Sequence, residues 1–161
     1  MLGKLDQFWA SQLSLCGCSS DFPSACDGAY AADGGWMYTN VDFAKQLNAS
    51  VGETPELYMY AHEYGHELQN YYGIPRSTMQ RRELQADCLG GYYLGSLVCS
   101  GQTTELDIKT TLTVACLIAD GTGDPVHDES THGTCVQRVG AVLIGIYVYL
   151  HNYAPFDGCK L

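Results

Sequence analysis

Two short motifs constrain the fold of this chain most, because both must lie on helices that face each other. Residues 62–66 (HEYGH) fit the pattern HExxH, and residues 83–87 (ELQAD) fit the pattern ExxxD. Residues four apart in a helix project from the same face, one turn above the other. The two histidines can therefore reach one metal ion, and Glu83 and Asp87 can approach it from a second helix.

The residues around the motifs predict two consecutive helices. Thr54-Pro55-Glu56 is typical of a helix start, with an N-cap hydroxyl, a proline and an acidic residue in the first turn. Gly73-Ile74-Pro75 is typical of a helix end near Tyr72. Ser77-Thr78-Met79-Gln80 fits a capping box and predicts a second helix that runs to about Cys99. Because the connection is short, we expect the two helices to be antiparallel neighbours.

This arrangement is typical of a catalytic zinc site. Two histidines and one carboxylate bind zinc and leave its fourth tetrahedral position to water. Glu63 can take a proton from that water, and Asp87 can accept the free ring N–H of a ligand histidine. Either motif alone also fits a solvated polar helix face. Together they predict a Zn²⁺ ion bound by His62, His66 and Glu83.

Several blocks of the sequence, in order, resemble the bacterial putative neutral zinc metallopeptidase family. They are residues 62–70 (HEYGHELQN), 83–91 (ELQADCLGG) and 131–138 (THGTCVQR), together with a Gly-Asp-Pro loop at 123–125 and a cysteine loop and strand at 16–43. The resemblance covers roughly residues 16–159. It implies a gluzincin-like site with His62, His66 and Glu83 as metal ligands and Glu63 as the catalytic base.

The resemblance also points to two further features of the site. His132 lies at the centre of the block 131–138, where an imidazole could stabilise the oxyanion of a tetrahedral intermediate. The alternative is a histidine that is hydrogen-bonded to the backbone at the start of a helix. Residues 36–42 form the strongest predicted strand, and zincin-like peptidases pair an exposed edge strand with extended substrate. A purely structural strand is the alternative there.

The remaining turn and cap signals predict the rest of the architecture. Residues 4–14 fit a short amphipathic helix, a third helix runs from near Thr104 to Gly121, and residues 121–133 form a polar loop. The last helix begins at Thr134 in a capping box and ends near Tyr153. We expect a single domain over residues 1–161, of the mainly helical α+β class, zincin-like with a small sheet. A hydrophobic content of 46% excludes a disordered chain.

The charge balance excludes several classes of partner. Eight basic residues against eighteen acidic residues give a net charge of -10. Nucleic acids and anionic membranes bind clusters of lysine and arginine, so neither is expected as a partner. The most apolar segment, residues 139–150, falls short of the roughly twenty residues that cross a bilayer. No membrane span is expected, and the expected partner is a peptide or protein substrate.

The eight cysteines suggest an oxidising compartment, so we expect an extracytoplasmic or secreted protein. Cys88 and Cys99 lie on one predicted helix, about 16 Å apart along its axis, and cannot bridge each other. Cys159 is a candidate partner for either, while Cys135 stands where the family pattern has a small residue. The first ten residues lack the charged start and apolar run of a signal peptide, so any targeting segment would lie outside this sequence.

These features predict a zinc-dependent peptidase with Glu63 as general base. His132 or a tyrosine would bind the developing oxyanion. Two alternatives stay open: a non-catalytic binding protein stabilised by zinc, and a zinc hydrolase that acts on a non-peptide amide. Glu63 favours an enzyme, because a structural zinc site would not need it and would close its fourth position with a protein ligand.

Overall fold

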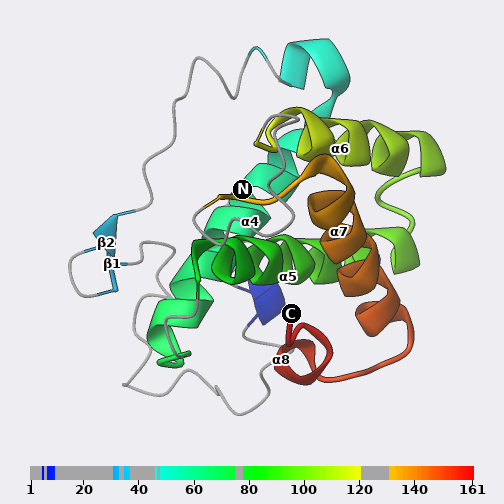
Figure 1. Cartoon of the computed structure of the whole chain (residues 1–161). Helices are drawn as coiled ribbons and strands as arrows, with labels where there is room; N and C mark the ends of the chain where they lie inside the picture. Colours follow the sequence, from blue (N-terminus) through cyan, green and yellow to red (C-terminus); the bar gives the residue numbers. More distant parts are fainter. Residues whose placement is uncertain are drawn as a thin grey trace. The chain divides into compact units, whose positions relative to one another are not determined.

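The computed structural model describes residues 5, 7–9, 31–32, 35–36, 46, 48–74, 78–120 and 131–161 (Figure 1). The chain divides into two compact units, residues 1–39 and residues 40–161. The described part is mainly helical, as the sequence predicted. The expectation of a single domain over the whole chain stays a prediction.

In the first unit, residues 5 and 7–9 are helical and lie within the predicted helix at 4–14. β1 (Ala31–Ala32) pairs antiparallel with β2 (Gly35–Trp36), with Ala31 opposite Trp36. Only the first residue of the predicted strand at 36–42 is described, so a sheet of the predicted extent is not seen in the described part. The irregular cysteine loop, predicted to run to about Gly35, lies outside the described residues except at residues 31–32 and 35, which form strands in place of the predicted irregular segment.

In the second unit, the long helix α4 (Glu53–Tyr71) carries the HExxH motif, and residues 46 and 48–51 before it are also helical. The prediction of Thr54 as its N-cap is wrong, since the N-cap is Gly52 and the helix begins at Glu53, two residues before the predicted first helical residue Pro55. Gly52 has a φ of 90° and no side chain caps the helix. The hydroxyl of Thr54 instead lies 3.1 Å from that of Thr103. This hydrogen bond links the start of α4 to the segment that precedes α6 (Glu105–Leu117).

The end of α4 agrees with the predicted stop. Gly73 has a φ of 59°, and the N–H groups of Gly73 and Ile74 donate back to carbonyls of the last helical turn. This pattern is a Schellman motif, which glycine favours because it needs a left-handed residue. α5 (Met79–Cys99) follows and ends where predicted. Its N-cap is Thr78, one residue later than the predicted cap. The side chain of Thr78 accepts a hydrogen bond from the N–H of Arg81.

Two further helices each begin with a complete capping box. α6 (Glu105–Leu117) starts with Thr104 and Asp107 in reciprocal hydrogen bonds, and α7 (Cys135–Leu150) starts with Thr134 and Gln137 in the same arrangement. The box of α7 was predicted from the sequence. Each box satisfies backbone N–H groups that would otherwise lack partners at the helix start.

The prediction that the third helix reaches Gly121 is wrong, because α6 ends at Leu117. The carbonyl of Ile118 accepts a hydrogen bond from Nη1 of Arg138 at 3.2 Å, and Cys116 forms a disulfide with Cys135. Both links reach across to the first turn of α7. The end of α6 therefore lies at contacts with another helix.

A second disulfide returns the C-terminal segment to the centre of the unit. After α7, the short helix α8 (Pro155–Gly158) leads to Cys159, which is bonded to Cys88 on α5 with a Cα–Cα distance of 5.7 Å. Of the two predicted partners, Cys159 therefore pairs with Cys88, and Cys99 is an exposed free thiol. The two disulfides suggest an oxidising environment. Within the described ranges, no helix has the length and apolar character to cross a membrane.

α5 lies between α4 and α7, and it packs against both (Figure 1). Glycines allow the α5–α7 contact to be close: a Cβ on Gly91 would clash with the backbone of Val142, and a Cβ on Gly145 with the backbone of Cys88. Helix axes approach closely only where such small residues meet. The fully buried core around α5 includes Tyr58, Ala61, Leu68, Ala86, Leu89, Leu94 and Val142.

Candidate metal centre

The two histidines of α4 lie side by side near the middle of that helix. His62 is buried and His66 is partly exposed, with side-chain exposures of 8% and 19%. Their ring centroids are 4.8 Å apart and their planes are almost perpendicular, at 87°. The helical spacing of four residues thus presents two imidazoles to one point, as the HExxH pattern predicted.

Glu83 of α5 meets both histidines. One carboxylate oxygen lies 3.2 Å from Nε2 of His62, and the other lies 3.2 Å from Nε2 of His66. One candidate ligand atom from each of the three residues lies within 4.8 Å of the others. The structure therefore brings together the three side chains that the sequence singled out as metal ligands.

A close contact between the two helices places Glu83 at this distance. Gly65 lies between the two histidines in sequence, and a Cβ built there would be 3.0 Å from the Cα of Ala86 and 3.1 Å from its carbonyl oxygen. Any larger residue than glycine at position 65 would push α5 away from α4. The variable positions of the two motifs thus contribute the small residues that let the ligand-bearing faces approach.

Asp87 lies directly behind His62. Its side chain is fully buried, and Oδ1 accepts hydrogen bonds from Nδ1 of His62 at 2.7 Å and from the hydroxyl of Tyr58 at 2.5 Å. Arg138 of α7 donates to both carboxylate oxygens at 2.8 Å, through Nε and Nη2. This paired geometry compensates a carboxylate that burial alone would make unstable.

The charges of this cluster shift the ionisation of its members. Burial raises the pKa of Asp87, but hydrogen bonds from His62 and Arg138 outweigh that effect and lower it. Burial likewise lowers the pKa of His62, but hydrogen bonds with Asp87 and Glu83 raise it to about 9. For Glu83, contacts with the two histidines outweigh burial and lower the pKa. Asp87 and Glu83 therefore act as fixed negative charges that favour a positive charge at the histidines.

His66 also has a hydrogen-bond partner at Nδ1. Nδ1 of His66 lies 3.0 Å from Oε1 of Gln69, one turn further along α4. Both Nδ1 atoms therefore face hydrogen-bond acceptors, which leaves the two Nε2 lone pairs directed toward the Glu83 carboxylate. Lone pairs that face each other require a positive charge between them, either a proton or a metal cation. Two imidazole nitrogens and a carboxylate oxygen are a donor set that fits zinc.

A cavity of about 360 Å³ opens onto this group. Besides the three candidate ligands, it is lined by Met59, Glu63, Ile118, His132 and Arg138. Glu63 is exposed, so its carboxylate is accessible from the cavity. The donor group is therefore open to a ligand from outside rather than closed by a fourth protein side chain among the described residues.

His132 also lines this cavity, with a side chain that is about half exposed. Its backbone N–H and its Nδ1 both face the carboxylate of Asp120, and the Nδ1–Oδ2 distance is 3.1 Å. Asp120 in turn donates its backbone N–H to the carbonyl of Gly133. The structure thus places His132 on the same cavity as Glu63, fixed through its Nδ1 side.

Four polar residues of the site were not identified from the sequence: Tyr58, Gln69, Gln85 and Arg138. Tyr58 and Gln69 had a usable signal, because they lie on the same face of α4 as the two histidines. Arg138 had another signal, as the only charged residue within the apolar α7. A charged residue is almost never fully buried unless it is paired, so an arginine on such an apolar helix, if buried, needs a partner from another element.

The comparisons with known proteins agree with this geometry. Residues 3–147 match the family described as "Putative neutral zinc metallopeptidase". Rv2575, an uncharacterised protein of Mycobacterium tuberculosis (strain ATCC 25618 / H37Rv), is 32% identical over 131 residues, which cover 63% of this chain and 45% of the relative. YpfJ, an uncharacterised protein of Escherichia coli (strain K12), is 29% identical over 133 residues, covering 68% and 46%.

The chain spans less than half the length of these curated relatives. No solved structure gives a significant match. The family match, in contrast, extends over most of the chain and includes both helices of the candidate centre. The chain therefore belongs to the Putative neutral zinc metallopeptidase family.

Proposed function

We propose that this chain is a zinc-dependent peptidase whose metal is held by His62, His66 and Glu83. The observation that carries the proposal is the convergence of these three side chains on one side of a cavity that Glu63 also lines. A structural zinc site would be closed by a fourth protein ligand, whereas this group faces open space among the described residues. The family to which the chain belongs supports the same assignment.

A zinc ion in this position would supply Lewis-acid chemistry, polarising a peptide carbonyl and making a water molecule more acidic. Glu63 follows His62 directly in sequence and is exposed at the cavity, so its carboxylate can remove a proton from the attacking water. The water oxygen bonds to the carbonyl carbon, and the C–N bond breaks. The proton held by Glu63 then passes to the leaving amine nitrogen.

We assign two supporting roles to residues around this centre. Asp87 holds the ring of His62 through Nδ1, so that Nε2 points toward Glu83. His132 is fixed by Asp120 through Nδ1, and Nε2 has no partner among the described residues. That nitrogen is the one available to the carbonyl oxygen of a substrate as negative charge develops there.

A peptide library separates this function from its alternatives. The purified protein is incubated with a random peptide library, with and without a zinc chelator, and the products are read by mass spectrometry. We expect cleavage that the chelator abolishes and that added zinc restores. Zinc binding without any cleavage would favour the zinc-stabilised binding protein. Release of ammonia or an amine from non-peptide amides, with peptides left intact, would favour the other hydrolase.

A further inference from the structure

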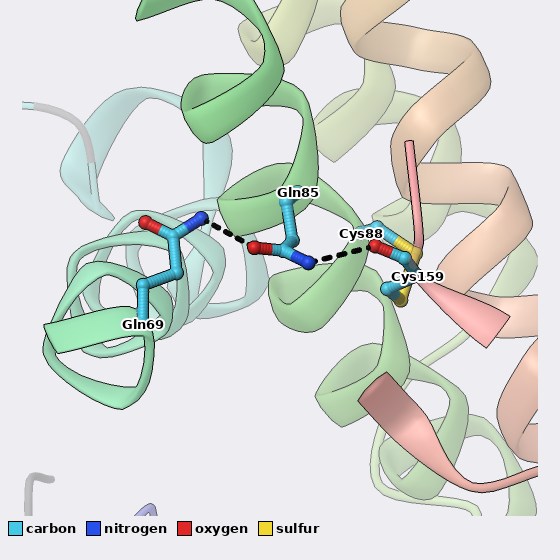
Figure 2. Close-up of a disulfide and its surroundings, with 4 residues drawn as sticks. All are labelled: Gln69, Gln85, Cys88 and Cys159. Carbon is cyan, nitrogen blue, oxygen red and sulfur yellow. Dashed lines mark hydrogen bonds between the residues drawn. A yellow bond between two sulfur atoms is a disulfide. The ribbon is translucent and has the colours of Figure 1, made fainter. Parts of the chain in front are cut away.

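A chain of side-chain amides connects His66 to the C-terminal segment of the protein. Gln69 of α4 faces Nδ1 of His66 with Oε1, and its Nε2 donates to Oε1 of Gln85 on α5 at 3.0 Å. Nε2 of Gln85 donates in turn to the carbonyl oxygen of Cys159 at 3.1 Å. Figure 2 shows Gln85 between Gln69 and Cys159, with the Cys88–Cys159 disulfide beside it.

Two backbone carbonyls fix the direction of every hydrogen bond in this chain. A carbonyl oxygen only accepts, so Cys159 requires the NH₂ group of Gln85 and leaves Oε1 of Gln85 facing Gln69. The carbonyl of Arg82 accepts from Nε2 of Gln69 at 2.8 Å and imposes the same orientation on that amide. Oε1 of Gln69 must then face His66, and an acceptor there requires an N–H on Nδ1 of the ring.

The disulfide supplies the last anchor of the chain. Cys88 follows Gln85 by one helical turn on α5, so its bond to Cys159 places the Cys159 carbonyl next to the Gln85 amide. Cys159 is fully buried and Gln69 is only 2% exposed. Water therefore has little access to replace Cys159 or Gln69 as a partner.

We propose that the Cys88–Cys159 disulfide orients the metal ligand His66 through Gln85 and Gln69, which are positioning residues rather than catalytic ones. This inference rests on the proposed function, because it takes His66 as a ligand of zinc. The tether keeps the Cys159 carbonyl in place, the two amides keep their polarity, and Nε2 of His66 keeps its lone pair toward Glu83. Such hydrogen-bond chains strengthen one another in a buried setting.

The first test replaces an amide by an isosteric apolar side chain. Gln69→Met should weaken zinc binding by roughly 10–100-fold, the usual effect of losing a direct partner of a ligand histidine, and Gln85→Met by a smaller factor of roughly 3–10-fold. The dissociation constant is measured by competition with a chromogenic zinc chelator. Gln80→Met is the matched control, because Gln80 is a buried glutamine of α5 that bonds toward Thr131 and Gln137 instead. Its zinc affinity should stay within about two-fold of the parent value.

The second test combines the amide with the disulfide in a double-mutant cycle. Cys88→Ala/Cys159→Ala should weaken zinc binding in the parent chain, but should have little further effect when Gln85 is already methionine. Residues that act through one network give non-additive effects, whereas independent losses of stability add. Additive effects on zinc affinity would overturn the proposal, as would a Gln85→Met variant that binds zinc like the parent.

A third measurement does not depend on zinc or on turnover. In the zinc-free protein, the ring ¹⁵N chemical shifts of His66 report which nitrogen carries the proton. We expect Nδ1 to carry a proton in the parent, whether or not Nε2 also carries one toward Glu83, and to be unprotonated in part of the Gln85→Met molecules. Unchanged protonation of Nδ1 in that variant would overturn the proposal. If the protein binds zinc and these tests support the amide chain, but no peptide is cleaved, the peptidase assignment fails while this inference stands.

Discussion

Asp87 accepts hydrogen bonds from three side chains that belong to two helices, although its own side chain has no exposure to solvent. A buried carboxylate of this kind is stable only when its partners remain in place, because an uncompensated buried charge costs several kcal/mol. The same residue faces Nδ1 of His62, so we expect stability and metal affinity to be coupled at this position.

Replacing Asp87 by asparagine separates this positioning role from the chemistry. Asp87→Asn removes the negative charge, so His62 loses its strongest acceptor and Arg138 loses its counter-ion. We expect zinc affinity to fall by roughly 10–100-fold. The turnover of the zinc-saturated variant should fall by a smaller factor. Chelator competition and cleavage at saturating zinc measure the two quantities. Parent-like zinc affinity in Asp87→Asn would contradict this role.

Glu83 is the proposed third ligand of the zinc ion. Glu83→Ala removes the carboxylate that faces both histidines, so the purified variant should retain little of the single zinc ion expected per chain. Metal content is measured by inductively coupled plasma mass spectrometry on protein purified without added chelator. Stoichiometric zinc in Glu83→Ala would show that another residue completes the ligand set.

At the scale of the helices, each end is fixed either by local signals or by contacts with other helices. The capping box of α7 and the glycine stop of α4 are local, and both were predicted from a few adjacent residues. The start of α4 and the end of α6 instead lie at contacts with other segments, made by Thr103, by Arg138 and by a disulfide. No periodic pattern within a helix contains that information, so both boundaries were predicted wrongly.

The same distinction applies to the candidate site. The pairing of His62 with His66, and of Glu83 with Asp87, follows from helical spacing that the sequence states directly. Arg138 reaches Asp87 from a helix 51 residues further along the chain. The amide chain from His66 likewise depends on a disulfide with a sequence separation of 71. Such partners are fixed by tertiary packing, so sequence reasoning missed them.

The two capping boxes provide a prediction at the scale of the elements. Thr134→Ala and Thr104→Ala each remove an N-cap side chain, so each should lower the free energy of unfolding by about 0.5–2 kcal/mol. Arg138 lies in the first turns of α7, so Thr134→Ala should also weaken zinc binding, whereas Thr104→Ala should not. Denaturant unfolding and chelator competition test this. Equal effects of the two variants on zinc affinity would contradict the link between α7 and the site.

At the scale of the whole molecule, the described part of residues 40–161 combines the packed helices α4, α5, α6 and α7 with two disulfides. The disulfides join elements that carry the site: one ties the C-terminal segment to α5, and the other ties α6 to α7. A reducing compartment would remove both constraints. The architecture thus agrees with the oxidising environment that the cysteine content suggests.

The two disulfides should contribute unequally to stability. A crosslink lowers the entropy of the unfolded chain more when it closes a longer loop, and the separations here are 71 and 19 residues. The loop-closure argument gives roughly 4 and roughly 3 kcal/mol. We expect Cys88→Ala/Cys159→Ala to destabilise the zinc-free protein more than Cys116→Ala/Cys135→Ala. Urea unfolding of both variants measures the difference, and the opposite order would contradict the expectation.

We propose that Glu63 performs the proton transfers of a zinc peptidase without holding the metal. The most direct test measures zinc content and peptide cleavage together in the parent and in Glu63→Gln, which keeps the size of the side chain but removes its basic carboxylate. We expect parent-like zinc content and thermal stability in Glu63→Gln, with turnover lower by roughly 10²–10⁴-fold. If Glu63→Gln cleaves a quenched fluorescent peptide at the parent rate, Glu63 is not the general base, whatever the zinc content of the variant.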